Sequence, residues 1–389
     1  MIKRVFLVVL DSFGVGAMPD AADFGDEGCS TIRSVSKSPK LKIPNLISMG
    51  LGNIEGAEII GSCKSPLGAY GRMGELSKGK DTTTGHWEIT GVVSKQPMPT
   101  FPNGFPSEIT DRLSQMIGRG ILCNEPYSGT KVIRDYGEEH LRTGDIILYT
   151  SADSVFQVAA HEEKIPLAEL YEICETARKL LTGKYAVGRV IARPFAGAAP
   201  EFYRTESRRD FSLEPPEETL LDRLSQSGMD VIGVGKISDI FAGRGITQSL
   251  PVHGNSECED ALEELLEKDF HGLCFVNLVD FDMVYGHRND INGYAAALSE
   301  FDLRLSRILP KLGSDDLLII TADHGCDPGD VSTDHTREYV PLLVYGEKIR
   351  PVSLGTQNGF STLAASVAEM LGVGGCDKYA VSFYGGIRK

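Results

Sequence analysis

An apolar run that ends abruptly in a carboxylate and an imidazole is the feature that most limits what this chain can fold into. Residues 317–322 read LLIITA and lead directly into Asp323 and His324. A run without polar alternation is typical of a strand buried on both faces, as in the parallel sheet of an α/β fold. Such sheets carry their functional sites beyond the carboxyl ends of the strands. We therefore expect Asp323 and His324 at that edge, with His335 returning to it on the following loop.

The same arrangement recurs at two other places in the chain. Residues 5–10 are continuously apolar and end at Asp11, and residues 273–279 end in a short acidic stretch that contains Asp282. His287 follows Asp282 after four intervening residues. Any one of these residues alone could serve in an ordinary turn or helix cap. As a set, strands that end in carboxylates and are followed by histidines indicate a metal site.

The strand ends together offer six nitrogen and oxygen ligands. That number is more than one catalytic metal with an open position can use. It suits a pair of divalent metals, an arrangement that stabilises the charge of a phosphoryl group. The expected ligands are Asp11, Asp282, His287, Asp323, His324 and His335.

A polar loop supplies hydroxyl groups that such a metal pair could activate. Thr82, Thr83 and Thr84 stand between Asp81 and Gly85. A hydroxyl is a weak nucleophile unless a metal or a base activates it. The other interpretation is a solvated loop that caps a helix. The residues alone do not distinguish one threonine from the others.

Prolines divide the chain into segments. They recur between residues 97 and 106, and Pro215-Pro216 forms a second break. The intervening segment has its own strand and helix patterns, including apolar residues at helical spacing between residues 167 and 180. We predict an α/β core with a mostly parallel sheet flanked by helices, and a smaller inserted α+β domain. The predicted boundaries are 1–97 and 215–389 for the core and 98–214 for the insert.

The charge balance limits the partners of the chain. The formal net charge is -15 over 389 residues. Binding to nucleic acid or to an acidic membrane surface needs a basic face, so we expect neither partner. The insert nevertheless contains a cluster of arginines, which either bind a phosphate or form salt bridges with neighbouring acids. The cluster comprises Arg189, Arg193, Arg204, Arg208 and Arg209.

Two further patterns bear on the compartment. No apolar run approaches the roughly 18 residues that a membrane span requires, and the short N-terminal run reads as a strand. The eight cysteines form no Cys-x-x-Cys pair. Reduced thiols in the cytoplasm are the simplest interpretation of that spacing.

These motifs resemble the alkaline phosphatase superfamily, and several longer stretches resemble its bacterial phosphopentomutase family. The superfamily likeness is carried by Asp11-Ser12, the Asp81-Thr82 loop, Asp282-x4-His287, Asp323-His324-Gly325 and Asp334-His335-Thr336. The narrower likeness is carried by residues 80–88, 149–154, 188–195 and 235–240. It extends nearly from end to end and includes the insert, which implies an alkaline-phosphatase-like core with a cap domain.

The resemblance also implies a role for each matching residue. The first metal would be held by Asp282, His287 and His335, and the second by Asp11, Asp323 and His324, with manganese as the expected ion. Thr82 would carry the phosphoryl group, and the family pattern has a methionine where this chain has Thr83. The contacts to a phosphosugar would be Ser151, Asp153, Arg189, Arg204 and Lys236.

The activity implied by the resemblance is that of an isomerase. It would interconvert the 1-phosphate and 5-phosphate of ribose or deoxyribose through a phosphothreonine and a bisphosphate intermediate. A sugar bisphosphate would prime the enzyme, which we expect to be a cytoplasmic monomer in nucleoside catabolism and salvage. Other possibilities are a metal-dependent phosphatase, a cofactor-independent phosphoglycerate mutase and a non-catalytic metal-binding protein. The threonine loop and the cap motifs argue against the phosphoglycerate mutase.

Overall fold

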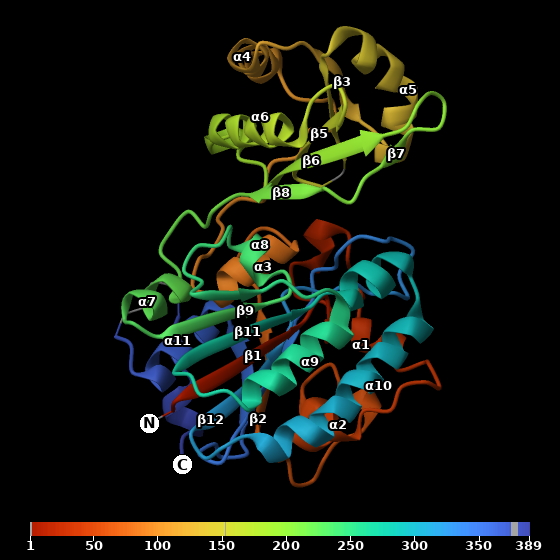
Figure 1. Cartoon of the computed structure of the whole chain (residues 1–389). Helices are drawn as coiled ribbons and strands as arrows, with labels where there is room; N and C mark the ends of the chain where they lie inside the picture. The colour runs from red at the N-terminus through yellow and green to blue at the C-terminus, as the bar shows by residue number, and fades with distance from the viewer. Residues whose placement is uncertain (1, 152, 375–379) are drawn as a thin grey trace. The chain divides into compact units, whose positions relative to one another are not determined.

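The chain forms two compact units in a computed structural model that describes residues 2–151, 153–374 and 380–389 (Figure 1). Unit 1 comprises Met1–Gln96 and Pro215–Lys389, and unit 2 comprises Pro97–Glu214. Three residues used in the sequence analysis, Met1, Ala152 and Cys376, lie outside the described residues. Each unit has its own sheet.

The sheet of unit 1 has eight strands in the order β10-β9-β11-β1-β12-β13-β2-β14. Among these strands β13 alone runs antiparallel to its neighbours. The predicted mostly parallel sheet is therefore confirmed. The strands are β1 (Arg4–Leu10), β2 (Ala69–Gly74), β9 (Asp230–Val234), β10 (Gln248–Leu250), β11 (Gly272–Leu278), β12 (Asp316–Thr321), β13 (Val340–Tyr345) and β14 (Ser353–Asn358).

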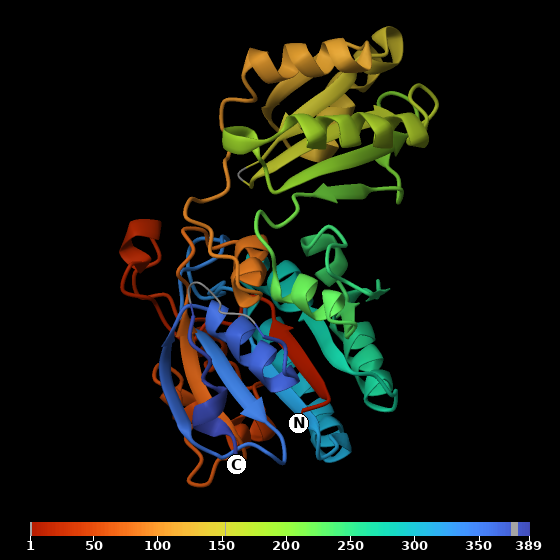
Figure 2. The ribbon, with the colours of Figure 1, turned by 90° about the vertical axis from the view of Figure 1, so that its left-hand side faces the viewer.

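Helices cover both faces of this sheet (Figures 1 and 2). On one face α9 contacts β9 and β11, and α10 packs against α9, α1 and α2. On the other face α7 and α8 contact β9, and α11 contacts β1 and α3. The helices are α1 (Thr31–Val35), α2 (Pro44–Met49), α3 (Thr82–Ile89), α7 (Leu220–Gln226), α8 (Ile237–Ile240), α9 (Gly254–Leu266), α10 (Ile291–Ile308), α11 (Ser361–Leu371) and α12 (Tyr384–Ile387).

Burial on both faces explains why the central strands lack polar alternation. Every residue of β11 and β12 is buried, as is every residue of β1 after Arg4. The core of unit 1 therefore lies along the three strands whose ends carry the predicted ligands. Each square ångström of apolar surface buried there stabilises the folded state by roughly 25 cal/mol.

The strand register determines where the predicted ligands emerge. Val9 of β1 pairs with Thr321 of β12. Asp11 and Asp323 each lie two residues further on, so they leave adjacent parallel strands at the same level. On the other side of β1, Leu10 pairs with Leu278 at the end of β11. The segment that carries Asp282 therefore begins at the same edge of the sheet.

Unit 2 is a mixed sheet with helices on both faces. Its strands follow the order β3-β4-β5-β6-β7, with β8 also paired to β6. Side chains of β4 alternate: Ile146 and Leu148 join the core beneath α4 and α6, and Ile147 and Tyr149 join the core beneath α5. The elements are α4 (Ser107–Ile117), β3 (Ile121–Pro126), α5 (Gly129–Thr143), β4 (Ile146–Thr150), β5 (Val155–His161), α6 (Leu167–Leu180), β6 (Arg189–Ala196), β7 (Tyr203–Arg204) and β8 (Arg209–Ser212).

Two properties of the whole chain follow from the described residues. None of the described helices is both long and apolar enough to cross a lipid bilayer. The seven cysteines within the described ranges are all free thiols.

Candidate metal centre

The structure brings the predicted ligands Asp11, Asp323 and His324 together directly beyond β1 and β12. His324 Nε2 lies 3.4 Å from Asp11 Oδ1 and 3.4 Å from Asp323 Oδ2. One ligand atom from each of these three buried residues lies within 4.8 Å of the other two. The three can therefore coordinate one ion.

The other three predicted ligands form an adjacent trio. Asp282 lies in the π-helical turn η5 (Phe281–Tyr285) that follows β11. Its Oδ2 is 3.2 Å from His287 Nε2, and its Oδ1 is 3.4 Å from His335 Nε2. The Nε2 atoms of His287 and His335 are 3.1 Å apart. Single π-helical turns often occur at functional sites, and this one turns a carboxylate toward two imidazoles.

Two of the three histidine rings are oriented as metal ligands usually are. His324 Nδ1 lies 3.0 Å from the Gly325 carbonyl oxygen, and His287 Nδ1 lies 2.6 Å from the Thr333 carbonyl oxygen. These carbonyls can only accept, so each Nδ1 carries the proton and each Nε2 presents its lone pair to the site.

Unsatisfied carboxylate oxygens test whether a metal fits. Asp11 Oδ1, Asp282 Oδ1 and Asp323 Oδ2 are buried and have no hydrogen-bond partner among the described residues. An unpaired buried carboxylate is costly, and a divalent cation at each trio would offset that cost. The donor set of carboxylates and imidazoles fits such a cation.

Cys326 is a potential ligand that the sequence analysis missed. Its Sγ belongs to a group with ligand atoms of Asp282 and His287 that all lie within 4.8 Å of one another. The signal available in the sequence was its position two residues after His324. Burial strongly raises the pKa of this thiol, and the nearby charge of Asp282 raises it further.

The electrostatics reflect the concentration of negative charge. Burial and the charges of Asp323 and Asp282 raise the pKa of Asp11 well above its ordinary value. Burial alone would also raise the pKa of Asp282, but the facing His335 and His287 hold it well below its usual range. Burial lowers the pKa of His335, and the charge of Asp282 outweighs that effect and raises it to about 9.

Two buried polar residues that the sequence analysis missed, Asn277 and His86, lie against the carboxylates of Asp11 and Asp323. Asn277 Nδ2 donates to Asp11 Oδ2 at 2.8 Å and lies 3.4 Å from His86 Nε2. His86 Nδ1 lies 3.1 Å from Asp323 Oδ2 and 2.9 Å from the Thr82 carbonyl oxygen. The sequence contained a signal for each residue. Asn277 interrupts an apolar strand. His86 follows Thr82 by four residues, so Thr82 and His86 lie on the same face of their helix.

The threonine loop forms the start of α3. Asp81 is the N-cap and accepts from the Thr84 backbone N–H at 3.0 Å and from Thr84 Oγ1 at 2.6 Å. Thr84 is therefore committed to capping. Thr82 is the first residue of the helix, and its Oγ1 lies 3.2 Å from His324 Nε2.

Gly85 allows α3 to approach the candidate metal centre. A Cβ at this position would lie 2.1 Å from the Asp323 carbonyl oxygen and 3.0 Å from Asp323 Cβ. Any side chain here would push the helix away from β12. The glycine after the three threonines therefore determines how closely Thr82 can lie to His324.

The predicted phosphosugar contacts are distributed over both units. Lys236 belongs to unit 1, where it follows β9 and is the N-cap of α8. Its charge lowers the pKa of Asp11 and so opposes the effect of burial. In unit 2, Ser151 and Asp153 lie on the loop between β4 and β5. Arg189 starts β6, pairs with Val155 in the sheet and lies 3.6 Å from Asp210.

Arg204 lies on β7 beside the opposite end of β6, where it pairs with Phe195. Its guanidinium nevertheless packs on the start of α5. The closeness is shown by Gly129, where a Cβ would lie 1.5 Å from Arg204 Nη2 and 2.7 Å from Tyr149 Oη. Arg208 forms two 2.7 Å hydrogen bonds to Asp210. For the arginine cluster, the sequence analysis left open phosphate binding or salt bridges. Salt bridges account for Arg208 and for one contact of Arg189.

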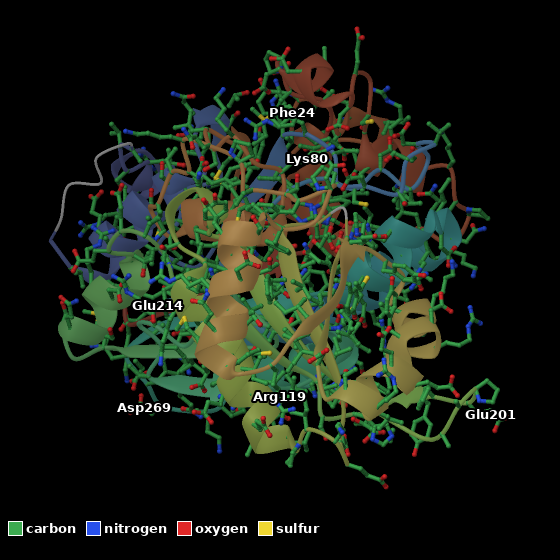
Figure 3. The ribbon with its side chains drawn as sticks, turned by 90° about the horizontal axis from the view of Figure 1, so that it is seen from above. Phe24, Lys80, Arg119, Glu201, Glu214 and Asp269 are labelled. Carbon is green, nitrogen blue, oxygen red and sulfur yellow. The ribbon has the colours of Figure 1, made fainter. Side chains whose placement is uncertain are left out.

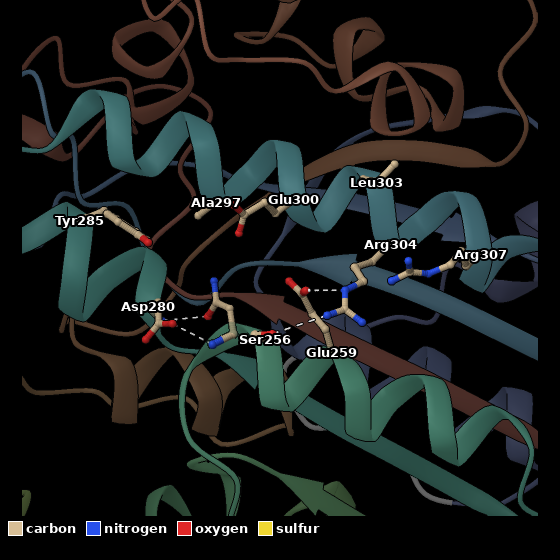
Figure 4. A pocket seen from close by; sticks show the side chains of 10 residues that line it. Ser256, Glu259, Asp280, Tyr285, Ala297, Glu300, Leu303, Arg304 and Arg307 are labelled. Atoms are coloured by element: carbon tan, nitrogen blue, oxygen red, sulfur yellow. Dashed lines mark hydrogen bonds and ion pairs between the residues drawn. The ribbon is translucent and has the colours of Figure 1, made fainter.

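A separate cavity of about 560 Å³ lies between α9 and α10 (Figure 4). Its described lining includes Asp280, Glu259 and Arg304 and none of the six predicted ligands. Arg304 Nε lies 3.3 Å from Glu259 Oε2, so charges in this cavity are largely paired with each other.

Comparison with known proteins shows the family to which the chain belongs. The model of the Metalloenzyme superfamily matches residues 3–374. A phosphopentomutase of Acetivibrio thermocellus is 56% identical over 95% of this chain and 96% of its own length. A phosphopentomutase of Carboxydothermus hydrogenoformans is 55% identical over 100% of both chains. The chain belongs to the phosphopentomutase family. The predictions of this family, of an isomerase and of metal binding are thereby confirmed.

The solved structures add evidence on the fold of this phosphopentomutase family member. The structure of the PH0037 protein from Pyrococcus horikoshii aligns with this chain at a TM-score of 0.52 and 15% sequence identity. The alignment covers 97% of this chain and 99% of the PH0037 chain. At that identity the likeness concerns the fold alone. It agrees with the predicted α/β core, a mostly parallel sheet flanked by helices, which is confirmed.

Gly85→Ala tests the close approach of α3. We expect it to destabilise the protein by about 1–3 kcal/mol, because the clash is with backbone, and to weaken the binding of divalent metal by displacing Asp323. Thermal unfolding and calorimetric titration measure the two effects. Gly386→Ala in α12 is the control, since a Cβ there meets nothing within 4 Å. Equal effects of the two substitutions would contradict the account.

The raised pKa of His335 makes metal binding depend on pH. Its imidazole must lose a proton to coordinate a cation. Between about pH 6.5, the ordinary value of histidine, and about pH 9, we expect the apparent affinity to rise with pH by about tenfold per unit for each proton released. Titration calorimetry in buffers of different ionisation enthalpy counts these protons. An affinity independent of pH over this interval would contradict the prediction.

Proposed function

We propose that this chain interconverts the 1-phosphate and 5-phosphate of ribose and deoxyribose by passing a phosphoryl group through Thr82. The observation that carries the proposal is the position of the Thr82 hydroxyl, 3.2 Å from Nε2 of His324, a member of the trio with Asp11 and Asp323. The neighbouring Thr84 is occupied as part of the helix cap. The names of the curated relatives agree with this activity.

In the proposed reaction the phosphorylated form of Thr82 is the resting state of the active enzyme. The anomeric hydroxyl of ribose 5-phosphate attacks the phosphorus, the bond to Thr82 Oγ1 breaks, and ribose 1,5-bisphosphate forms. After the bisphosphate turns round, Thr82 Oγ1 attacks the 5-phosphate. Ribose 1-phosphate leaves and Thr82 is phosphorylated again. The attacking hydroxyl loses its proton in each step, and the leaving oxygen regains one.

The residues of this chain have defined tasks in that reaction. Asp282, His287 and His335 would hold one divalent metal, and Asp11, Asp323 and His324 the other. When bound, the two cations neutralise the charge of the transferring phosphoryl group. His86 and Asn277 keep Asp323 and Asp11 in place, and the Asp81 cap orients the first turn of α3.

Further parts of the proposal concern the substrate and the cell. We propose Ser151, Asp153, Arg189, Arg204 and Lys236 as contacts to the phosphosugar, since hydroxyl, guanidinium and ammonium groups suit its oxygens. Manganese is the proposed metal, and a sugar bisphosphate the activator that first phosphorylates Thr82. The free cysteines support a reducing compartment. We assign the enzyme to the cytoplasm and to nucleoside catabolism and salvage, and expect a monomer.

Thr82→Ala tests the proposal. We expect turnover of ribose 1-phosphate to fall by on the order of 10⁴-fold or more, as for loss of a catalytic nucleophile. Phosphorus NMR follows the substrate, the 5-phosphate and inorganic phosphate in one sample. Thr83→Ala is the control and should remain active. Full activity of Thr82→Ala would refute the nucleophile, and free phosphate as the main product of the unaltered enzyme would indicate a phosphatase.

Substitution of one carboxylate per trio tests the two metal sites. We expect Asp282→Asn and Asp11→Asn each to lose one of two tightly bound manganese ions, because each leaves the other trio intact. Elemental analysis after dialysis gives the stoichiometry. Asp280→Asn is the matched control: Asp280 precedes the same turn, but its carboxylate accepts from the Asn255 backbone N–H at 2.8 Å. Loss of both ions in each variant would show that the trios are not separate sites.

A further inference from the structure

We propose that Arg337 is a positioning residue that fixes the loop of Thr82 relative to the loop of His335. The inference rests on the proposed role of Thr82 as the phosphoryl carrier. Arg337 lies two residues after His335 and is only 2% exposed. A buried guanidinium needs both charge compensation and a partner for each N–H, and its partners here lie on two distant stretches of the chain, at Asp20 and at residues 75–79.

Every N–H of the guanidinium has an acceptor. Nε and Nη2 donate to the two carboxylate oxygens of Asp20 at 3.2 and 3.1 Å. Nη1 donates to Glu75 Oε2 at 2.7 Å and to the Gly79 carbonyl oxygen at 2.8 Å. Nη2 also donates to the Glu75 carbonyl oxygen at 2.9 Å. The guanidinium therefore ties three separate points of the chain to one rigid plane.

One of these contacts leads to Thr82. Gly79 packs against the cap of α3, because a Cβ on Gly79 would lie 2.9 Å from both Asp81 Oδ2 and Thr84 Oγ1. By holding the Gly79 carbonyl, Arg337 fixes the backbone on which this cap is built. Thr82 is the residue that the cap presents to His324.

The backbone of Arg337 leads to the metal ligands. Thr336 pairs with Gly325 through two hydrogen bonds of 2.7 and 3.1 Å, so the segment after His335 is joined to the segment after His324. Thr336 Oγ1 also donates to the buried Glu338 carboxylate at 2.7 Å. Movement of Arg337 would therefore be transmitted to the loops of both histidines.

A second link runs in parallel through Asp26. Its Oδ2 accepts from the Arg337 backbone N–H at 2.8 Å and from Lys80 Nζ at 3.0 Å. Lys80 lies two residues before Thr82. The ring of Phe24 packs under the guanidinium at 4.9 Å. Phe24 and Lys80 are both labelled in Figure 3.

Lysine cannot replace this arrangement. It has three donors at one point and no planar fork, whereas Arg337 uses five donors in a fixed plane. The loss would release the Gly79 carbonyl or the Glu75 carbonyl and let the Thr82 loop shift. A displacement of about 1 Å of a reacting group can cost on the order of 10²-fold in rate.

Arg337→Lys, compared with Arg4→Lys, tests the inference. Arg4 is a matched control in the same unit: it forms a two-pronged pair with Asp316 at 2.8 and 2.6 Å and donates to the Leu266 carbonyl oxygen at 3.0 Å. It lies at the amino ends of β1 and β12, the edge opposite the ligands. Both variants are made in the full-length, manganese-loaded enzyme.

We expect both variants to unfold at a lower temperature. Only Arg337→Lys should lower kcat, by about 10–100-fold, with KM and manganese affinity within about threefold of the unaltered enzyme. A kcat no lower than that of Arg4→Lys would overturn the inference. So would a loss of activity explained wholly by lost manganese.

Lys80→Met decides the question if Arg337→Lys does not fold. It removes the parallel link to Asp26 and also the 3.7 Å ion pair of Lys80 Nζ with Asp334 Oδ2. It should lower kcat while manganese binding persists; an unchanged kcat would overturn the inference. Thr82→Ala separates the two proposals. If Thr82→Ala remains active, the proposed function fails. If Thr82→Ala is inactive and neither link affects kcat, only the role of Arg337 fails.

Discussion

Three carboxylates buried at one edge of a sheet are the constraint on which the rest of the structure depends. Asp11, Asp282 and Asp323 each retain an oxygen without a hydrogen-bond partner among the described residues. Several buried like charges cannot persist without compensating cations or protons. The facing imidazoles of His287 and His324 present Nε2 lone pairs to the cluster, in the arrangement that a divalent cation requires. The electrostatic cost of the cluster and its proposed chemistry therefore have the same origin.

Local departures from regular structure serve this cluster. Ser12 adopts a left-handed conformation with φ of 72°, which costs about 1–3 kcal/mol for a residue other than glycine. In that conformation its backbone N–H donates to Asp323 Oδ1 at 3.1 Å. The π-helical turn turns Asp282 toward two histidines, and Gly85 lets α3 lie against β12. Each departure occurs where a strand or helix reaches the candidate metal centre.

The sequence predicted those parts of the protein that depend on local pattern. Continuous apolar runs located β1, β11 and β12, and parallel pairing then required their ends to meet at one edge, so the ligand cluster followed from pattern and topology together. Pattern and topology could not predict which threonine presents its hydroxyl to the cluster, because the cap that occupies Thr84 depends on three-dimensional contacts. The resemblance to a family supplied Thr82.

Residues that support the site were harder to predict. Arg337 and Glu338 follow the His335 motif, but their partners lie hundreds of residues away, on segments without regular periodicity. Asn277 and His86 left weak local signals, a polar residue in an apolar strand and a spacing of four on a helix. Such supporting contacts depend on which loops the fold brings together, and hydrophobic patterning carries no information about that.

Anomalous X-ray diffraction from crystals of the manganese-loaded protein tests the central claim most directly. The account predicts two anomalous peaks, one within bonding distance of Asp282, His287 and His335 and the other of Asp11, Asp323 and His324, with Thr82 Oγ1 facing the pair. A single peak would contradict it. Two peaks elsewhere, with the three carboxylates hydrogen-bonded to one another through shared protons, would contradict it as well.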